Sequence, residues 1–341
     1  MNIAVIAKTR LPIAEPFRGG LEAFTHGICL EYQRAGHEVT LYAHADSDEG
    51  LNVVSFYGSE HRSGVDFEAY EADEYMSILR DIESKSFDII HNNSTHELPI
   101  IWGTRASVPI VTTLHAPPLF SKIKPAITAS QTSTNLHFVS ISDSLAASWK
   151  PYLGRPAHVI HNGIDATMWP LTRRSSDYLL WYGRMVPTKG LDIALEVAHL
   201  LDMPLHFAGS LDDQEYYDSR IKPRISAVDV YLGHLNQGEI LRAMRGAAAM
   251  INPARWEEPF GLTNIEAMAA GVPVAGFDRG AFREIISDAS GRVAYDTTVA
   301  ALAAATSSAM RLPSTAVSEA AQRFDSKRMA ENYIRYFEAI T

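Results

Sequence analysis

The sequence is short of several features that would each indicate a class of protein. It has one cysteine, Cys29, so it can form no internal disulfide, which fits a reducing compartment. No apolar run approaches the roughly 20 residues needed to cross a bilayer. The apolar start, residues 1–7, stands before its nearest cations, Lys8 and Arg10, and a signal peptide has the reverse order. We therefore expect a cytoplasmic protein with at most peripheral membrane contact.

Positive charge is also scarce, because 30 Lys and Arg stand against 40 Asp and Glu, for a net charge of −10. An acidic surface argues against general nucleic-acid or anionic-membrane binding, and it requires any phosphate site to be a local basic island. The dinucleotide fingerprint G-x-G-x-x-G and the P-loop are missing, which counts against a dehydrogenase and an NTPase.

What is present is a chain long enough for about two domains of roughly 150 residues each. Short apolar runs alternate with segments of helical spacing from end to end, a pattern typical of parallel sheets covered by helices. The polar stretch 168–177 reads as a linker between the two halves. We predict an α/β protein with two doubly wound, Rossmann-like domains at 1–170 and 171–323, and a last helix at 324–341.

Residues 255–274, RWEEPFGLTNIEAMAAGVPV, read as a loop, a helix and a buried strand in quick succession. Pro259 and Gly261 break regular structure in the loop, and Gly271 ends a helix predicted over 262–270. A glycine-containing loop that runs into a helix N-terminus binds anions, because unpaired N–H groups and the positive end of the helix dipole point outward there. The stretch therefore predicts an anion site.

Two carboxylates, Glu258 and Glu266, bracket this loop with seven residues between them. A carboxylate does not bind phosphate, so the pair favours hydrogen bonds from the hydroxyls of a sugar or ribose beside the phosphate. The alternative for Glu266 is a capping box with Thr263, in which it only reaches back to the start of the helix.

A second loop, Gly183-Arg184-Met-Val-Pro-Thr-Lys189-Gly190, joins a predicted strand at 178–182 to a helix at 191–201. The guanidinium of Arg184 suits bidentate phosphate contact, and Lys189 supplies a point charge. Exposed Arg and Lys are usually only solvated, but the combination with two glycines in a strand-to-helix loop is more specific than either cation.

The first half offers weaker candidates. Gly19-Gly20 precedes a predicted helix, so it is a second candidate for an anion site at a helix N-terminus. The alternative is a plain tight turn. His115 ends a predicted strand at 108–114, where the ligand crevice of a parallel sheet lies, although a lone histidine at a strand end is more often structural.

Four charged side chains fit a solvated surface better than a site. Asp46 and Asp48 resemble a paired-carboxylate metal site, but they stand in a polar, loop-like stretch. Lys122 and Lys124 lie in the weakly periodic segment 119–133, which could line an acceptor site but is expected to be a loop. We expect no metal site.

With both loops in view, the chain resembles the retaining, family 4 type of glycosyltransferase with the two-domain GT-B fold. The resemblance rests on Gly19-Gly20, Asn162-Gly-Ile-Asp165, the loop 183–190, and the motif Glu258-Pro-Phe-Gly with Glu266 and the following Ala-Met-Ala-Ala-Gly-Val-Pro-Val. The fold implied is two Rossmann-like domains facing a cleft, with the C-terminal helix crossing back to the first domain. One departure is a single glycine, Gly209, where many relatives carry two.

The resemblance also implies roles for matching positions. Arg184 and Lys189 would bind the diphosphate of the donor, Glu266 the ribose hydroxyls, and His115 would line the sugar pocket. Segment 208–235 would cradle the base. The full set implied to bind the nucleotide-sugar is Gly19, Gly20, Arg184, Lys189, Glu258, Phe260, Gly261, Leu262, Thr263 and Glu266, and the catalytic set is His115, Glu258, Arg184 and Lys189.

The expected activity is transfer of a sugar from a nucleoside-diphosphate sugar, with a UDP-sugar favoured, to a hydroxyl of a saccharide, lipid or natural product. We expect retention by same-face attack, without a metal cofactor, because two cations and two helix N-termini can neutralise the leaving diphosphate. A nucleotide-sugar epimerase, a non-catalytic nucleotide-sugar-binding protein, and a metal-dependent transferase using Asp46 and Asp48 remain as alternatives.

Overall fold

The computed structural model describes residues 1–56, 67–119, 121–172 and 175–341. This part of the chain divides into two compact units, Met1–Asn162 with Ser326–Thr341, and Gly163–Asp325. The division falls before the predicted boundary at 170 because Ile164 N donates to Phe324 O at 2.9 Å, which ties the entry of the second unit to its exit. The predicted linker, 168–177, therefore lies within the second unit, and its residues 173 and 174 are outside the described residues.

The first unit is built on a parallel seven-stranded sheet with the order β3-β2-β1-β4-β5-β6-β7. Its central strands are apolar and buried on both faces, as strands covered by helices on both sides must be. In register, Ile3 of β1 pairs with Val39 of β2 and with Ile89 of β4. The strands are β1 Asn2–Ile6, β2 Glu38–Tyr42, β3 Val53–Val54, β4 Ile89–Asn92, β5 Ile110–Leu114, β6 Leu136–Ser140 and β7 His158–Val159.

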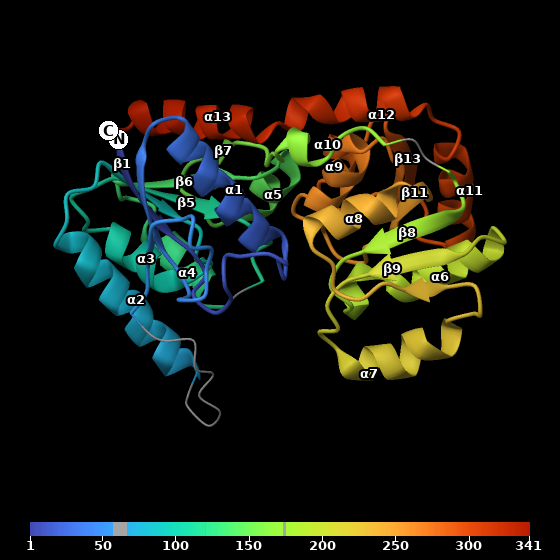
Figure 1. The fold of residues 1–341 in the computed structure, drawn as a ribbon. Coiled ribbons are helices and arrows are strands. Elements are labelled where there is room, and N and C mark those ends of the chain that lie inside the picture. The colour runs from blue at the N-terminus through green and yellow to red at the C-terminus, as the bar shows by residue number, and fades with distance from the viewer. Residues whose placement is uncertain (57–66, 120, 173–174) are drawn as a thin grey trace. The chain divides into compact units, whose positions relative to one another are not determined.

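Helices cover both faces of this sheet (Figure 1). They are α1 Gly20–Arg34, α2 Phe67–Glu83, α3 Glu97–Gly103, α4 Ile123–Ala129, α5 Asp143–Trp149 and α13 Ser326–Glu338. The last helix, α13, packs on α1 and anchors itself in the core, where Tyr333 OH lies 3.1 Å from Thr113 Oγ1. The C-terminal helix thus completes the core of the first unit.

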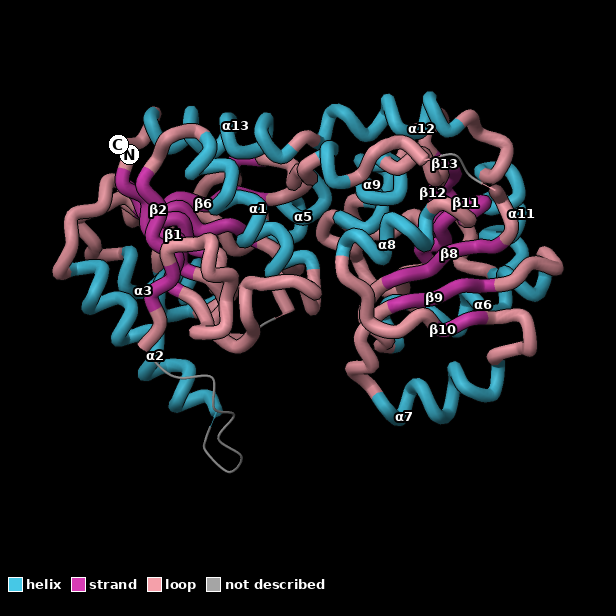
Figure 2. The backbone as a smooth tube through the Cα atoms, viewed as in Figure 1, coloured by secondary structure: helices cyan, strands magenta, loops and turns pink. Residues whose placement is uncertain are grey.

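The second unit repeats the design with a parallel six-stranded sheet of order β10-β9-β8-β11-β12-β13 (Figure 2). The strands are β8 Tyr178–Tyr182, β9 Leu205–Ala208, β10 Val230–Tyr231, β11 Ala247–Asn252, β12 Val274–Phe277 and β13 Gly291–Ala294. Both sheets have the strand order of doubly wound nucleotide-binding domains, so the predicted fold class is confirmed.

The second unit also contains helices. They are α6 Leu191–Leu200, α7 Gln214–Tyr216 continued by a π-helix at Tyr217–Ile221, α8 Gln237–Met244, α9 Leu262–Ala269, α10 Phe282–Ile285, α11 Val299–Ala309 and α12 Ser314–Ala321. One large apolar cluster, with Leu195, Phe207 and Leu302 among its members, joins α6 and α11 to the strands. The loop 183–190 is therefore anchored at both ends, because β8 and α6 both belong to this apolar cluster.

The structure also corrects the prediction at several helices. Segment 119–133, expected to be a loop, contains α4, whose Ile123 and Ile127 are buried at helical spacing. Helices α2, α3 and α12 were not predicted from the sequence. Within the described residues, no helix combines the length and the hydropathy that crossing a bilayer requires.

Candidate functional site

Open parallel sheets bind ligands at the carboxyl ends of their strands, where the strand order reverses. In the second unit this point lies between β8 and β11, which pair Leu180 with Met250 (Figure 2). The loops 183–190 and 253–261 leave the sheet at these two strand ends. They are the two loops on which the sequence predicts phosphate and sugar contacts.

The loop after β8 presents the two predicted cations differently. The Arg184 side chain is about half exposed (45%), and its Nη1 lies 3.8 Å from Asp212 Oδ2, a loose ion pair. Lys189 ends the 3-10 turn Pro187–Lys189 and is only 22% exposed. The guanidinium thus faces solvent, whereas the ammonium is turned into the site.

The two loops touch along their backbones. Gly190 has φ +70°, and a Cβ at this position would lie 2.3 Å from Pro253 O, so a larger residue would force the loops apart. Arg255 N donates to Thr188 O at 2.8 Å, and the Arg255 guanidinium contacts both carboxylate oxygens of Asp192 at 2.7 Å. A bidentate pair of this kind has a fixed geometry, so it holds the second loop against the start of α6, directly after the first loop.

A three-residue contact forms where the loops meet. Lys189 Nζ donates to Glu258 Oε2 at 2.6 Å, and Trp256 Nε1 donates to the same oxygen at 3.0 Å. The ammonium also lies 5.0 Å from the centroid of the Trp256 ring, within cation–π range. The structure therefore brings Lys189 and Glu258 together as an ion pair. Trp256 was not among the predicted site residues, although its place inside the motif loop was an available signal.

The helix α9 begins where the motif loop ends. Gly261 is its N-cap with φ +90°, and no side chain caps this end. Phe260 is buried, while Gly261 and Thr263 are partly exposed. The Asn264 side chain would lie 2.5 Å from a Cβ on Gly261, which, with the positive φ, explains the glycine. An uncapped helix start at the strand ends is the anion-binding feature that the sequence predicts.

The capping-box alternative for Glu266 is wrong. Because α9 starts at Leu262, Glu266 stands in its second turn, where its Oε2 lies 2.9 Å from the hydroxyl of Tyr182. The same hydroxyl lies 2.7 Å from Thr263 O, so its one proton is shared between the two acceptors. Tyr182 ends β8, so it ties this strand to α9. The sequence predicts Tyr182 in a strand but not its contact with Glu266, because only the folded sheet brings the two residues together.

The environment of Glu266 favours its neutral form. The residue is 9% exposed, and burial raises the pKa of its carboxyl to about 7, against a smaller opposite effect of the Tyr182 hydrogen bond. The carboxyl therefore titrates near neutral pH. A pKa raised this far is more typical of functional groups than of surface carboxylates.

The predicted glycine pair of the first unit opens a helix. Gly19 is the N-cap of α1 and no side chain caps it. The carboxylate of Glu22 curls back toward this end, with Oε2 3.1 Å from the place of a Cβ on Gly19. A carboxylate is what the positive end of a helix dipole favours. The phosphate role of Gly19 and Gly20 stays a prediction.

His115 lies just after β5, at the carboxyl edge of the first sheet. Its Nε2 is 2.8 Å from Asn93 Oδ1, and its ring packs edge-on against Phe24 with 4.8 Å between centroids. Burial lowers the pKa of His115 to about 3, so the imidazole is neutral at physiological pH. Asn93 Nδ2 is buried without a hydrogen-bond partner, and such a group at a strand end is suited to a polar ligand.

Asp46 and Asp48, the predicted alternative metal ligands, make contacts with neighbouring residues of the first unit. Asp48 lies 2.7 Å from His26 Nε2 and accepts from Gly50 N at 2.8 Å, contacts that also lower the pKa of its carboxyl. Asp46 is exposed, and its backbone N–H donates to a ring nitrogen of His44. These contacts support the interpretation of the stretch as an ordinary loop.

The two lysines of segment 119–133 also contact neighbouring side chains. Lys122 pairs with Glu68 at 2.6 Å, with both side chains more than half exposed. Lys124 lies 5.7 Å from the ring centroid of Tyr152. Exposed ion pairs contribute little to stability, and these contacts among the described residues do not by themselves indicate an acceptor site.

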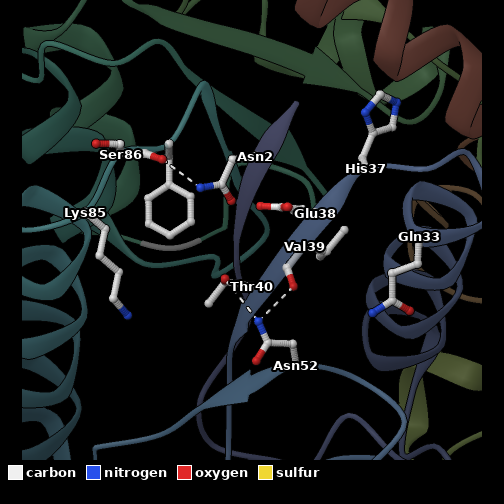
Figure 3. Close-up of a pocket in the computed structure, with 10 residues that line it drawn as sticks. Asn2, Gln33, His37, Glu38, Val39, Thr40, Asn52, Lys85 and Ser86 are labelled. Atoms are coloured by element: carbon white, nitrogen blue, oxygen red, sulfur yellow. Dashed lines mark hydrogen bonds between the residues drawn. The ribbon is translucent and has the colours of Figure 1, made fainter.

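A cavity of about 640 Å³ opens at the amino-terminal edge of the first sheet (Figure 3). Its polar lining is largely engaged by the protein: Asn2 Nδ2 donates to Ser86 O at 2.6 Å, and Asn52 Nδ2 donates to Val39 O at 3.2 Å. Because ligands bind parallel sheets at the opposite edge, this cavity is not our candidate site.

Two family models match the chain. The model described as Glycosyltransferase Family 4 matches residues 18–167, and the one described as Glycosyl transferases group 1 matches residues 169–328. The two ranges together take in most of the chain. The second range contains all the residues of the loops that meet at Lys189 and Glu258.

Individual proteins are similar to the chain as well. Glycogen synthase of Mycobacterium tuberculosis is 32% identical over 188 residues, which are 52% of this chain and 45% of that protein, so the chain spans about half the length of this curated relative. Sucrose-phosphate synthase from Thermosynechococcus elongatus matches with a TM-score of 0.85 at 14% identity, over 100% of this chain and 99% of that one. Anabaena Alr3699/HepE in complex with UDP-glucose matches with a TM-score of 0.77 at 18% identity, over 99% and 100%. At these identities the two structures establish the fold alone.

Proposed function

Because the chain belongs to the glycosyltransferases of the family 4 and group 1 type, whose models match its two halves, we propose that it moves a sugar from a nucleoside-diphosphate sugar to a hydroxyl acceptor. The donor favoured is a UDP-sugar, and the acceptor is a saccharide, a lipid or a natural product. The binding of UDP-glucose by Anabaena Alr3699/HepE, a protein of the same fold, supports this choice of donor.

The observation that carries the proposal is the meeting of Lys189 and Glu258 at 2.6 Å beside the uncapped start of α9. A cation and open backbone N–H groups suit a phosphate, while carboxylates suit hydroxyls. Glu266, on the same helix, offers the second carboxylate. Both kinds of ligand group occur in one molecule, a sugar joined to a nucleoside diphosphate.

The proposed mechanism relies on charge stabilisation. As the bond between the anomeric carbon and the phosphate oxygen breaks, the leaving diphosphate takes the electron pair and gains negative charge. Arg184, Lys189 and the start of α9 would each offer it charge-assisted hydrogen bonds, worth roughly 1.5–3 kcal/mol apiece. Three or four such bonds would supply about 5–10 kcal/mol where they strengthen in the transition state, so we propose that no metal ion is needed.

We further propose that the acceptor hydroxyl attacks from the face that the diphosphate leaves, so that the new bond keeps the anomeric configuration. The acceptor proton would pass to the departing phosphate oxygen, which is the base generated on that face. His115 would contribute as a neutral hydrogen-bonding group toward the sugar, because a pKa of about 3 leaves it without a proton to donate as an acid at neutral pH.

The experiment is a turnover assay with Lys189→Ala and Glu258→Gln, using a panel of UDP- and GDP-sugars with simple glycoside acceptors. We expect at least a hundredfold loss of kcat/KM in each variant. Lys85→Ala is the matched control, since Lys85 forms a 2.6 Å ion pair with Asp81 in the first unit, and it should keep full activity.

Three outcomes would count against the proposal. Unchanged rates in both site variants would remove these residues from the chemistry. A changed sugar formed with no acceptor present would identify an epimerase. Tight binding of a nucleotide-sugar without release of diphosphate, in the presence of every acceptor class, would identify a binding protein.

A further inference from the structure

Trp256 is the member of the site that no motif assigns. It stands between Arg255, which fastens the two loops together, and the pair of acidic residues Glu257 and Glu258. Its ring is partly exposed rather than part of the apolar core. Its indole N–H donates to Glu258 Oε2 at 3.0 Å, and its ring lies 5.0 Å from Lys189 Nζ.

One carboxylate oxygen of Glu258 therefore has two donors, the ammonium of Lys189 at 2.6 Å and the indole of Trp256. The Glu258 side chain is 10% exposed, so it depends on these partners for compensation of its charge. Under the proposed function the diphosphate draws the ammonium of Lys189 toward itself. The carboxylate would then be free to rotate away unless another donor held it.

We propose that Trp256 is a positioning residue that keeps the Glu258 carboxylate aimed at the donor sugar while Lys189 binds the diphosphate. This inference rests on the proposed function of the site. The indole is suited to the task because it has a single N–H with no acceptor function, on a rigid ring, so its direction is set by packing alone. Its ring face at the same time gives the ammonium a second favourable neighbour.

The proposed role of Trp256 concerns binding of the sugar and not binding of the diphosphate. Trp256 acts through Glu258, which contacts the sugar, and it offers the diphosphate no hydrogen bond. Replacement by phenylalanine keeps an aromatic face for Lys189 and removes only the N–H. The Trp256→Phe variant should therefore bind a nucleoside diphosphate almost as well as the wild type, and lose affinity selectively for the diphosphate that carries a sugar.

The experiment is isothermal titration of wild type and Trp256→Phe with UDP and UDP-glucose, and with GDP and GDP-mannose as a second pair. For the pair in which the wild type prefers the sugar, we expect the preference to fall about tenfold, equivalent to ~1.4 kcal/mol, with the diphosphate affinity changed less than about threefold. Trp102→Phe is the matched control, since Trp102 Nε1 also donates to a carboxylate, Glu83 Oε1 at 2.5 Å, in the first unit.

A double-mutant cycle with Glu258→Gln tests whether Trp256 influences the sugar preference through Glu258. If Trp256 acts through Glu258, adding Trp256→Phe to Glu258→Gln should change the sugar preference by less than about twofold. Equal effects in both backgrounds would overturn the inference. Thermal unfolding of each variant, compared with Trp102→Phe, separates a misfolded site from a misdirected carboxylate.

The remaining outcomes are distinct. A wild type that binds none of the four ligands contradicts the proposed function itself. A wild type that binds diphosphate and diphosphate-sugar equally contradicts the sugar role of Glu258, and with it the inference. A Trp256→Phe variant that keeps the full sugar preference, or that loses both ligands to the same degree, overturns the inference and leaves the proposed function standing.

Discussion

Donor binding should depend on pH between 6 and 8 because of the buried carboxyl of Glu266. Burial raises the pKa of this group to about 7. An ionised carboxylate can accept a hydrogen bond at each oxygen, as the two hydroxyls of a ribose require, whereas the protonated form must itself donate from one of them. Donor affinity should therefore rise with pH through the pKa of Glu266.

The size of the effect follows from the fraction of protein that is ionised. With a pKa of about 7, roughly a tenth of the molecules carry the Glu266 carboxylate at pH 6 and about nine-tenths at pH 8. The apparent dissociation constant varies inversely with the binding-competent fraction, so it should fall about tenfold across this range. A diphosphate esterified to a sugar has no ionisation of its own near neutral pH, which makes UDP-glucose the better probe than UDP.

Two variants test whether Glu266 is the group that causes the pH dependence of donor affinity. Glu266→Gln should bind more weakly at pH 8 and show no slope between pH 6 and 8. Tyr182→Phe removes a hydrogen bond that lowers the pKa of Glu266, so the midpoint of the affinity curve should move to higher pH. A flat wild-type curve, or the same slope in Glu266→Gln, would refute the assignment.

The same group makes stability depend on pH. Its folded pKa of about 7 lies above the ordinary value of 4.5, so the folded state holds the proton more tightly than the unfolded state. This contribution is fully present below pH 4.5 and is lost as the pH rises through 7, by about 3 kcal/mol. Glu266→Gln, which carries no charge to bury, should therefore raise the melting temperature at pH 8 relative to wild type and have less effect at pH 5.

Two substitutions test the contacts that hold the loops of the site, and a chelator tests whether turnover needs a metal ion. Gly190→Ala places a Cβ 2.3 Å from Pro253 O at φ +70°, so we expect a loss of roughly 1–3 kcal/mol in thermal unfolding together with weakened donor binding. Arg255→Lys cannot contact both oxygens of Asp192, so the donor KM should rise several-fold with a smaller change in kcat. Treatment with a chelator should leave turnover unchanged, and restoration of lost activity by a divalent ion would contradict the proposed mechanism.

The parts of the site that sequence analysis predicted are those with local signals. The strand 178–182 was predicted with its observed bounds, because an apolar run ended by glycine identifies it without knowledge of the fold. Helix α9 was predicted to within one residue for a similar reason, since Gly261 and Gly271 mark its two ends. Both glycines have positive φ, a property that the residue type itself indicates.

The parts that were missed depend on contacts between residues far apart in the chain. Tyr182 reads as one more apolar member of a buried strand, and nothing near it in sequence indicates a hydrogen bond to Glu266, 84 positions away. Helix α2 is a different case. Its buried residues Tyr75, Ile78, Leu79 and Ile82 recur at helical spacing, so this helix was readable and was overlooked.

The ion pair between Lys189 and Glu258 links donor binding to donor recognition. A carboxylate that is 10% exposed needs partners, and in the structure these are the ammonium of Lys189 and the indole N–H of Trp256. Under the proposed function the diphosphate competes with Glu258 for the ammonium, so the free energy of the ion pair opposes the binding of any diphosphate. A diphosphate that carries a sugar compensates for this cost, because its hydroxyls add donors to the one that Trp256 already supplies to the carboxylate. The pair therefore favours the intact donor over the nucleoside diphosphate that remains after transfer, and this difference assists product release in each turnover.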